Sequence, residues 1–144
     1  MSTRTATASN TPEGTAGPGA EPLIVDFPSG IPGFETCHRF VLVASAEIAP
    51  LMCLRSVEPP EASFLVVEPQ LIDPSYDRTL REFERVRLGG GDEPLLWLAI
   101  VSVVDGEAFV NLRAPIVINP RRMTGCQFIR DEAGYPVSYP LGRA

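Results

Sequence analysis

The chain has 144 residues, the length of one ordinary domain, and its net charge is −6, with twelve basic residues that are all arginine. A nucleic-acid surface needs clustered cations to neutralise phosphates, and only Arg121 and Arg122 stand together, so we expect no direct nucleic-acid binding. No apolar run approaches the roughly 20 residues of a membrane helix. Ser2–Ala20 has no apolar signal-peptide core either. We therefore expect a cytoplasmic protein that does not contact the membrane.

The first segment, residues 1–22, is dominated by Ser, Thr, Ala, Gly and Pro. Such a composition buries too little apolar area to offset the entropy lost on ordering. We predict that residues 1–22 form a disordered tail and that residues 23–144 form one folded domain.

Short β-rich runs separated by Pro and Gly follow the tail, a pattern typical of a β-protein. The strands predicted in this half are Leu23–Phe27, Phe40–Ala44, Leu51–Val57 and Ser63–Glu68. Between the first two, the Phe27–Phe34 segment holds two prolines and two glycines and predicts a compact loop. The short Glu58–Ala62 connection predicts a hairpin between the last two.

Helical spacing appears once, over residues 78–87, where Leu80 and Phe83 are predicted to share one side of a short amphipathic helix. Gly89–Gly91 ends this pattern. Without a following Lys-Ser/Thr pair, the three glycines indicate a connector and not a phosphate-binding loop.

The second half contains Asp105-Gly106, a dipeptide that favours a tight hairpin between Leu95–Val104 and Ala108–Leu112. Further strands are predicted at Ile116–Asn119 and Gln127–Arg130, and Tyr135–Leu141 is predicted to be an extended surface segment. Seven or more short strands and one short helix predict a mainly β fold, a small antiparallel β-barrel-like single domain.

Three motifs and the end of the chain resemble one family, in order, over about Ile24–Leu141. Phe27–Phe34 reads FPSGIPGF, Phe64–Pro69 reads FLVVEP, and Asn111–Asn119 reads NLRAPIVIN. Gln127 and the Tyr135–Leu141 segment stand where the closing elements of that family would. The set resembles the FliW family of flagellar assembly factors.

This resemblance implies a β-barrel-like factor that binds flagellin in the cytoplasm. In many bacteria such factors alternatively bind CsrA, a basic dimeric RNA-binding protein that represses flagellin translation, and antagonise it without competing with RNA. The acidic charge of this chain agrees with a basic partner. The family implies no catalysis and no cofactor.

The sequence departs from the family in two places. Relatives usually begin with a strand carrying an aromatic-Gly-Glu-Ile-like motif, and Thr11–Glu21 has no convincing equivalent. Gly89–Gly91 stands where relatives more often carry an acidic helix-and-loop segment. The first departure predicts an open barrel edge and the second a thinner acidic surface.

Reactive groups are sparse. Cys37 and His38 are adjacent, so on an extended chain their side chains point to opposite faces and cannot form a catalytic dyad. Cys37, Cys53 and Cys126 are widely spaced and predicted to be reduced, without disulfides or a metal site. We therefore predict no catalytic residue.

Four carboxylates, those of Asp73, Asp77, Glu82 and Glu84, lie within twelve residues and alternate with arginines. A solvated ion-pair face is favoured over a metal site because no histidine is nearby. A protein-docking surface is the next interpretation. The candidate partner-binding residues are Asp73, Tyr76, Asp77, Arg113, Asn119 and Tyr135.

Two further features have alternative interpretations. Pro115 lacks a backbone N–H, which favours a bend between strands over an exposed ridge of Arg113, Ala114 and Pro115. Trp97 lies in the most apolar run, which favours core packing. The alternative for Trp97 is the floor of a site for an apolar small molecule, which would make the chain a ligand-binding barrel.

Overall fold

The structure, a computed structural model, describes residues 23–131 and 134–143, so the predicted tail of residues 1–22 lies outside it. The described residues form one α-helix, α1, at Glu82–Arg87, and one 3₁₀ turn, η1, at Pro69–Leu71. The strands are β1 Leu23–Asp26, β2 Arg39–Ala44, β3 Met52–Ser56, β4 Ser63–Val67, β5 Leu96–Val104, β6 Glu107–Val110, β7 Ile116–Asn119, β8 Thr124–Gln127 and β9 Tyr139–Arg143.

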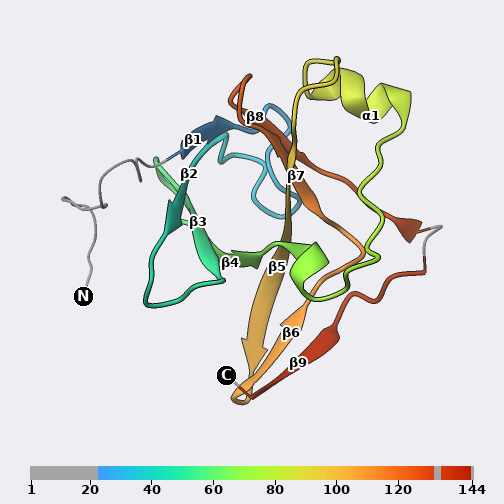
Figure 1. Cartoon of the computed structure of the whole chain (residues 1–144). Helices are drawn as coiled ribbons and strands as arrows, with labels where there is room; N and C mark the ends of the chain where they lie inside the picture. Colours follow the sequence, from blue (N-terminus) through green and yellow to red (C-terminus); the bar gives the residue numbers. More distant parts are fainter. Residues whose placement is uncertain (1–22, 132–133, 144) are drawn as a thin grey trace.

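Seven of these strands close into a barrel in the order β4-β3-β2-β1-β8-β7-β5, and β5 pairs back with β4 (Figure 1). All neighbours are antiparallel except β1 and β8, which meet in parallel at Asp26 and Thr124. β6 and β9 extend the sheet from β5 beyond the barrel. The mainly β, barrel-like prediction with one short helix is confirmed. The expected open barrel edge is wrong for the described residues, because β1 pairs with β8 and β4 pairs with β5.

β5 is the longest strand and connects the barrel to this extension. Its first residues pair with β7 and its last with β6, while Ala99–Val101 pair with β4 on the opposite edge. Leu98 is buried inside the barrel, and its neighbours Trp97 and Ala99 are buried outside it. A strand covered on both faces needs no polar alternation, which explains the unbroken apolar run in the sequence.

The barrel interior is filled by one apolar cluster. Its fully buried aromatic rings, Phe27 and Phe40, meet edge to face with centroids 5.3 Å apart. The cluster members are Val25, Phe27, Ile31, Cys37, Phe40, Leu42, Leu54, Ala62, Val66, Leu98, Ile116 and Ile118. Side chains and not solvent therefore occupy the lumen.

A second cluster lies outside the barrel wall, against the connection between β4 and β5. Its members are Val67, Tyr76, Leu88, Trp97, Ala99, Val101, Ala108, Val110, Leu112, Val117, Cys126 and Phe128. The β4–β5 connection, residues 68–95, carries η1 and α1 across this outer face (Figure 1). We call this connection the crossover segment.

Two glycines are required where backbones or rings approach closely. Gly30, in the FPSGIPGF loop, has φ +68°, and a Cβ there would lie 2.6 Å from the Cα of Glu35. Gly125 in β8 faces the Phe27 ring, whose nearest atom would be 2.8 Å from a Cβ. The loop motif thus holds Phe27 against the β1–β8 junction.

The predicted helix is present but shorter, and the prediction for its apolar side was wrong. α1 begins at Glu82, and Phe83 is 59% exposed, whereas Leu80 packs on the second cluster. The buried residue of α1 is Glu84, whose carboxylate accepts the backbone N–H of Arg81 and caps the helix. Among the described residues, no helix has the length and apolar character to traverse a bilayer.

The end of the chain also differs from the prediction. The eighth strand is Thr124–Gln127, three residues before the predicted Gln127–Arg130, because Met123 adopts φ +54° and turns the chain directly after β7. The predicted surface segment ends in β9, an edge strand that pairs with β6 and tolerates Pro140.

Candidate partner-binding surface

Asp73 and Asp77 shape the crossover segment through local turns. Asp73 Oδ1 accepts the backbone N–H and the hydroxyl of Ser75, and Asp77 Oδ1 accepts both groups of Thr79. The bond from the Thr79 hydroxyl is the main reason that the pKa of Asp77 is lowered. The Asp77 carboxylate therefore stays ionised near neutral pH, and the two turns fix the path of the chain on either side of Tyr76.

Tyr76 anchors the crossover segment to the barrel extension. Its side chain is 4% exposed, and its hydroxyl donates to the Leu112 carbonyl at 2.7 Å. Its ring stacks on Tyr135, with centroids 4.5 Å apart. Burial raises the pKa of Tyr76, so the phenol stays protonated and keeps donating this bond.

Tyr135 and Arg113 complete the same contact. The Tyr135 hydroxyl accepts the backbone N–H of Asp77 at 2.8 Å, and Arg113 Nε donates to the Tyr135 carbonyl at 2.8 Å. Arg113 is itself placed by Asn111, whose side-chain oxygen accepts the backbone N–H groups of Arg113 and Ala114. The structure therefore brings together five of the six predicted residues, Asp73, Tyr76, Asp77, Arg113 and Tyr135, which we call the Tyr76 cluster.

Asn119 lies apart from this cluster and is 1% exposed. Its amide nitrogen donates to the Leu88 carbonyl and to Glu93, and its oxygen accepts the backbone N–H groups of Arg121 and Arg122. These bonds tie the end of β7 to the end of the crossover segment. In this conformation Asn119 positions its neighbours and has no surface for a partner.

The bonds of Asn119 also act on Glu93. Hydrogen bonds from Asn119 and then from Arg122 lower the pKa of Glu93. Arg122 Nε lies 3.2 Å from the Glu93 carboxylate. Glu93 is therefore an ionised carboxylate whose charge is directed toward Asn119 and Arg122.

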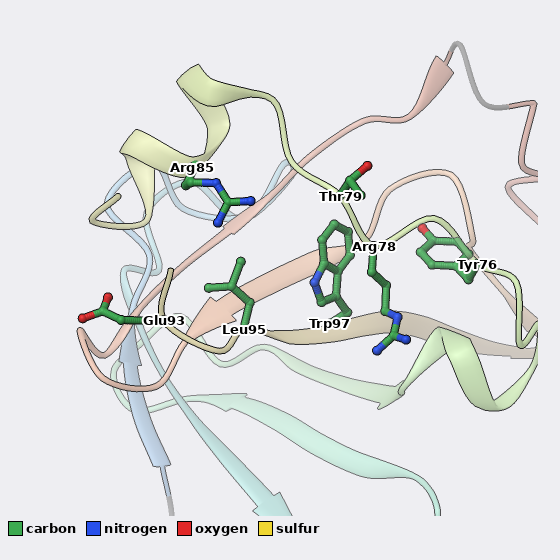
Figure 2. A pocket seen from close by; sticks show the side chains of 7 residues that line it. All are labelled: Tyr76, Arg78, Thr79, Arg85, Glu93, Leu95 and Trp97. Atoms are coloured by element: carbon green, nitrogen blue, oxygen red, sulfur yellow. The ribbon is translucent and has the colours of Figure 1, made fainter. Parts of the chain in front are cut away.

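Arg130 and Arg78 were missed by the sequence analysis. Arg130 is 5% exposed, its guanidinium lies 5.3 Å from the centroid of the Trp97 ring, and it donates to the Thr79 carbonyl. Arg78 is exposed beside an open pocket of about 420 Å³. Figure 2 shows this pocket, which is lined by Tyr76, Arg78, Thr79, Arg85, Glu93, Leu95 and Trp97. Isolated arginines carry no pattern that predicts such convergence.

The remaining residues that the sequence singled out, Cys37, His38, Pro115 and Trp97, occupy positions that the fold explains. Cys37 is buried and His38 is exposed, so the two side chains face opposite ways, as predicted. Pro115 is buried between β6 and β7, which supports the bend over the exposed ridge. Trp97 is 4% exposed and belongs to the second cluster outside the barrel, which supports core packing, although part of its ring also lines the open pocket.

Comparison with known proteins identifies the family. The sequence model described as FliW protein matches residues 11–141, a range that also includes the Thr11–Glu21 segment without a predicted family motif. The flagellar assembly factor FliW of Thermotoga neapolitana is 34% identical over 119 residues, 80% of each chain. That of Geobacter sulfurreducens is 36% identical over 125 residues, 84% of this chain and 77% of the relative.

A solved structure agrees with the sequence relatives. The crystal structure of a flagellar assembly factor FliW superposes with a TM-score of 0.75 at 33% identity, covering 85% of this chain and 87% of that one. The match therefore extends over the barrel and the layer outside it. This chain belongs to the FliW family.

Proposed function

We propose that this chain is a cytoplasmic flagellar assembly factor that binds flagellin and, where the genome encodes it, CsrA. Binding to CsrA would antagonise repression and so couple flagellin translation to free flagellin. The observation that carries the proposal is the family match, because relatives named flagellar assembly factor FliW align over four-fifths of the chain. The fold alone would not carry it, since one barrel can serve many functions.

The charge of the molecule supports a basic partner such as CsrA. The net charge is −6, and the crossover segment, residues 68–95, carries seven carboxylates against four arginines. Opposite fields steer diffusional encounter and raise association rates. CsrA, as a basic RNA-binding protein, would carry the complementary positive charge.

The chemistry of the described residues supports binding over catalysis. The carboxylates of Asp73 and Asp77 are engaged in turns, and that of Glu84 caps α1. Burial raises the pKa of the Cys126 thiol, which keeps it protonated and poorly nucleophilic. These groups maintain the fold of the crossover segment, and we propose that the protein acts without an enzymatic step.

The Tyr76 cluster is the proposed contact region. Asp77 is exposed, while Asp73, Arg113 and Tyr135 are partly exposed and come from segments far apart in the sequence. Tyr76 is buried and supports them from below. A partner that docks here would contact the crossover segment, the β6–β7 turn and the segment before β9 together.

The test is titration calorimetry with purified flagellin and CsrA from the same organism. We expect saturable binding of each. Linkage further requires that flagellin lower the affinity for CsrA by the same factor by which CsrA lowers the affinity for flagellin. Absence of binding to both proteins would overturn the proposal.

A matched pair of charge variants adds a control. Glu82→Arg on α1 and Glu47→Arg in the β2–β3 connection change the net charge equally, and both positions are exposed. We expect Glu82→Arg to weaken CsrA binding by roughly threefold or more, as for a charge at an interface rim, and Glu47→Arg to change it less. Equal effects would indicate that only the total charge matters.

A further inference from the structure

The open pocket beside Trp97 gathers positive charge on an acidic protein. Arg78 and Arg85 line it, and Arg130 lies behind its Trp97 and Thr79 walls. In Figure 2, Arg78 and Arg85 lie on either side of Trp97, with Tyr76 beyond Arg78. One guanidinium group thus lies over the indole ring, and two more line the pocket beside it.

Within the described residues, no carboxylate forms an ion pair with any of these three guanidinium groups. Arg85 Nη1 donates to the Gly91 carbonyl, and Arg130 donates to the Thr79 carbonyl; both acceptors are neutral. The Nε atom of Arg130 is buried without a hydrogen-bond partner. Arg130 is buried and bonds a neutral carbonyl, and it also lowers the pKa of the exposed Asp77, so this carboxylate balances its charge only in part.

The one carboxylate that lines the pocket is engaged elsewhere. Glu93 Oε1 accepts bonds from Asn119 and Arg122, and both groups lower its pKa. In Figure 2 its side chain points away from Trp97, at the end of the pocket. Glu93 is therefore engaged with Asn119 and Arg122 and forms no ion pair with Arg78 or Arg85.

The floor between the arginines is apolar. Leu95 and Trp97 supply it, and the edge-to-face contact of Tyr76 with Trp97 holds the indole in place. A ligand that fits both parts carries a carboxylate next to a short apolar stem. The Glu and Asp side chains of a protein segment have this form, and arginine pairs with carboxylates in a bidentate manner.

We infer that the pocket lined by Arg78, Arg85 and Trp97 binds an acidic side chain of the protein partner. The carboxylate lies between the two guanidinium groups, and its methylene stem lies on Leu95 and Trp97. Arg130 is a positioning residue that holds Trp97 and adds positive charge from behind. The inference rests on the proposed function, because it takes flagellin as the partner that supplies the acidic segment.

The test compares three variants of the full chain for binding to flagellin of the same organism. Arg78→Glu with Arg85→Glu reverses the charge of the pocket, whereas Arg78→Lys with Arg85→Lys retains it. Arg39→Glu with Arg55→Glu reverses the charge of two exposed arginines in β2 and β3, outside the pocket, and changes the net charge equally. Trp97 fluorescence and the unfolding midpoint report whether each variant is folded.

We expect the pocket reversal to weaken flagellin binding by about tenfold or more, as when a carboxylate loses its paired cation. The lysine variant loses less, and the distant reversal stays within about twofold of the parent. Equal losses in the two reversals, or none in either, would overturn the pocket assignment while leaving flagellin binding intact. If the parent chain does not bind flagellin, the proposed function itself fails.

Addition of sodium glutarate provides an independent measurement. This dicarboxylate presents two carboxylate groups on a short apolar stem, and it should quench or shift Trp97 emission in the parent and the distant reversal but not in the pocket reversal. The same response in all three proteins would contradict a carboxylate site beside Trp97.

Discussion

Inside the barrel, Phe40, Leu54 and Leu98 are fully buried in a cluster of apolar side chains, whereas outside it Tyr76, Asn119 and Arg130 are buried with polar groups bonded to backbone carbonyls. Apolar packing is large in free energy but not directional. Hydrogen bonds contribute less each, but they require one geometry. The barrel therefore supplies most of the stability. The crossover segment and the residues bonded to it, which together we call the crossover layer, supply a defined surface.

The largest expected effect is on the barrel side of this comparison. Replacing Phe40 by Ala removes a fully buried ring from contact with Phe27 and Phe64, and we expect a loss of about 3–5 kcal/mol in the free energy of unfolding. Urea denaturation followed by fluorescence measures it. Val57→Ala, at a position 42% exposed, should cost less than about 1 kcal/mol. Similar losses in both variants would refute the assignment of the main core.

A smaller effect is expected in the FPSGIPGF loop. Gly30→Ala combines a positive φ with a Cβ 2.6 Å from Glu35 Cα, and we expect it to cost roughly 3 kcal/mol through backbone strain and displacement. Gly33 also has a positive φ, but a Cβ there meets nothing within 4 Å, so Gly33→Ala should cost only about 1–2 kcal/mol. Equal unfolding midpoints would show that the close approach at Gly30 is unimportant.

The smallest effect on stability is expected in the crossover layer, where we also expect an effect on flagellin binding. Tyr76→Phe leaves the Leu112 carbonyl without its donor and should cost about 1–2 kcal/mol. Because the Tyr76 cluster is loosened, this variant should bind flagellin more weakly. Titration calorimetry measures the change in affinity. Tyr139→Phe, at an exposed tyrosine, serves as the control. Unchanged binding by Tyr76→Phe would separate the cluster from recognition.

The same tyrosine predicts a pH dependence. Its pKa is raised in the folded state above the unfolded value of about 10, so its contribution is fully present below pH 10 and is lost as the pH rises beyond that. Tyr76→Phe should therefore lose less stability than the parent between pH 10 and 11. Parallel pH profiles for the two proteins would contradict this role for Tyr76.

Most strands could be predicted because the local sequence signals agree with the packing that the fold requires. Asp105-Gly106 forms the expected hairpin turn, with both residues at positive φ, and the Pro- and Gly-rich loop follows β1 as predicted. β8 was misplaced because Gly125, in its middle, has weak strand propensity. This glycine is required by the Phe27 ring, a contact distant in sequence.

The sequence indicated most residues of the Tyr76 cluster, but it did not reveal the structural role of each. Tyr76, Asp77, Arg113 and Tyr135 converge, and aromatic and charged residues in Pro-rich loops indicated them. Asn119 belongs to a family motif, yet its burial makes it a support of the fold. Arg130 was missed because a cation over an indole depends on the β7–β8 register, which the spacing of residues does not reveal.

Hydrogen–deuterium exchange of this chain with and without flagellin tests the division between barrel and crossover layer most directly. We predict that flagellin protects peptides covering residues 73–81, 111–115 and 134–137, while β2 and β3 exchange as in the free protein. Protection confined to β2 and β3, with the crossover segment unaffected, would contradict the account.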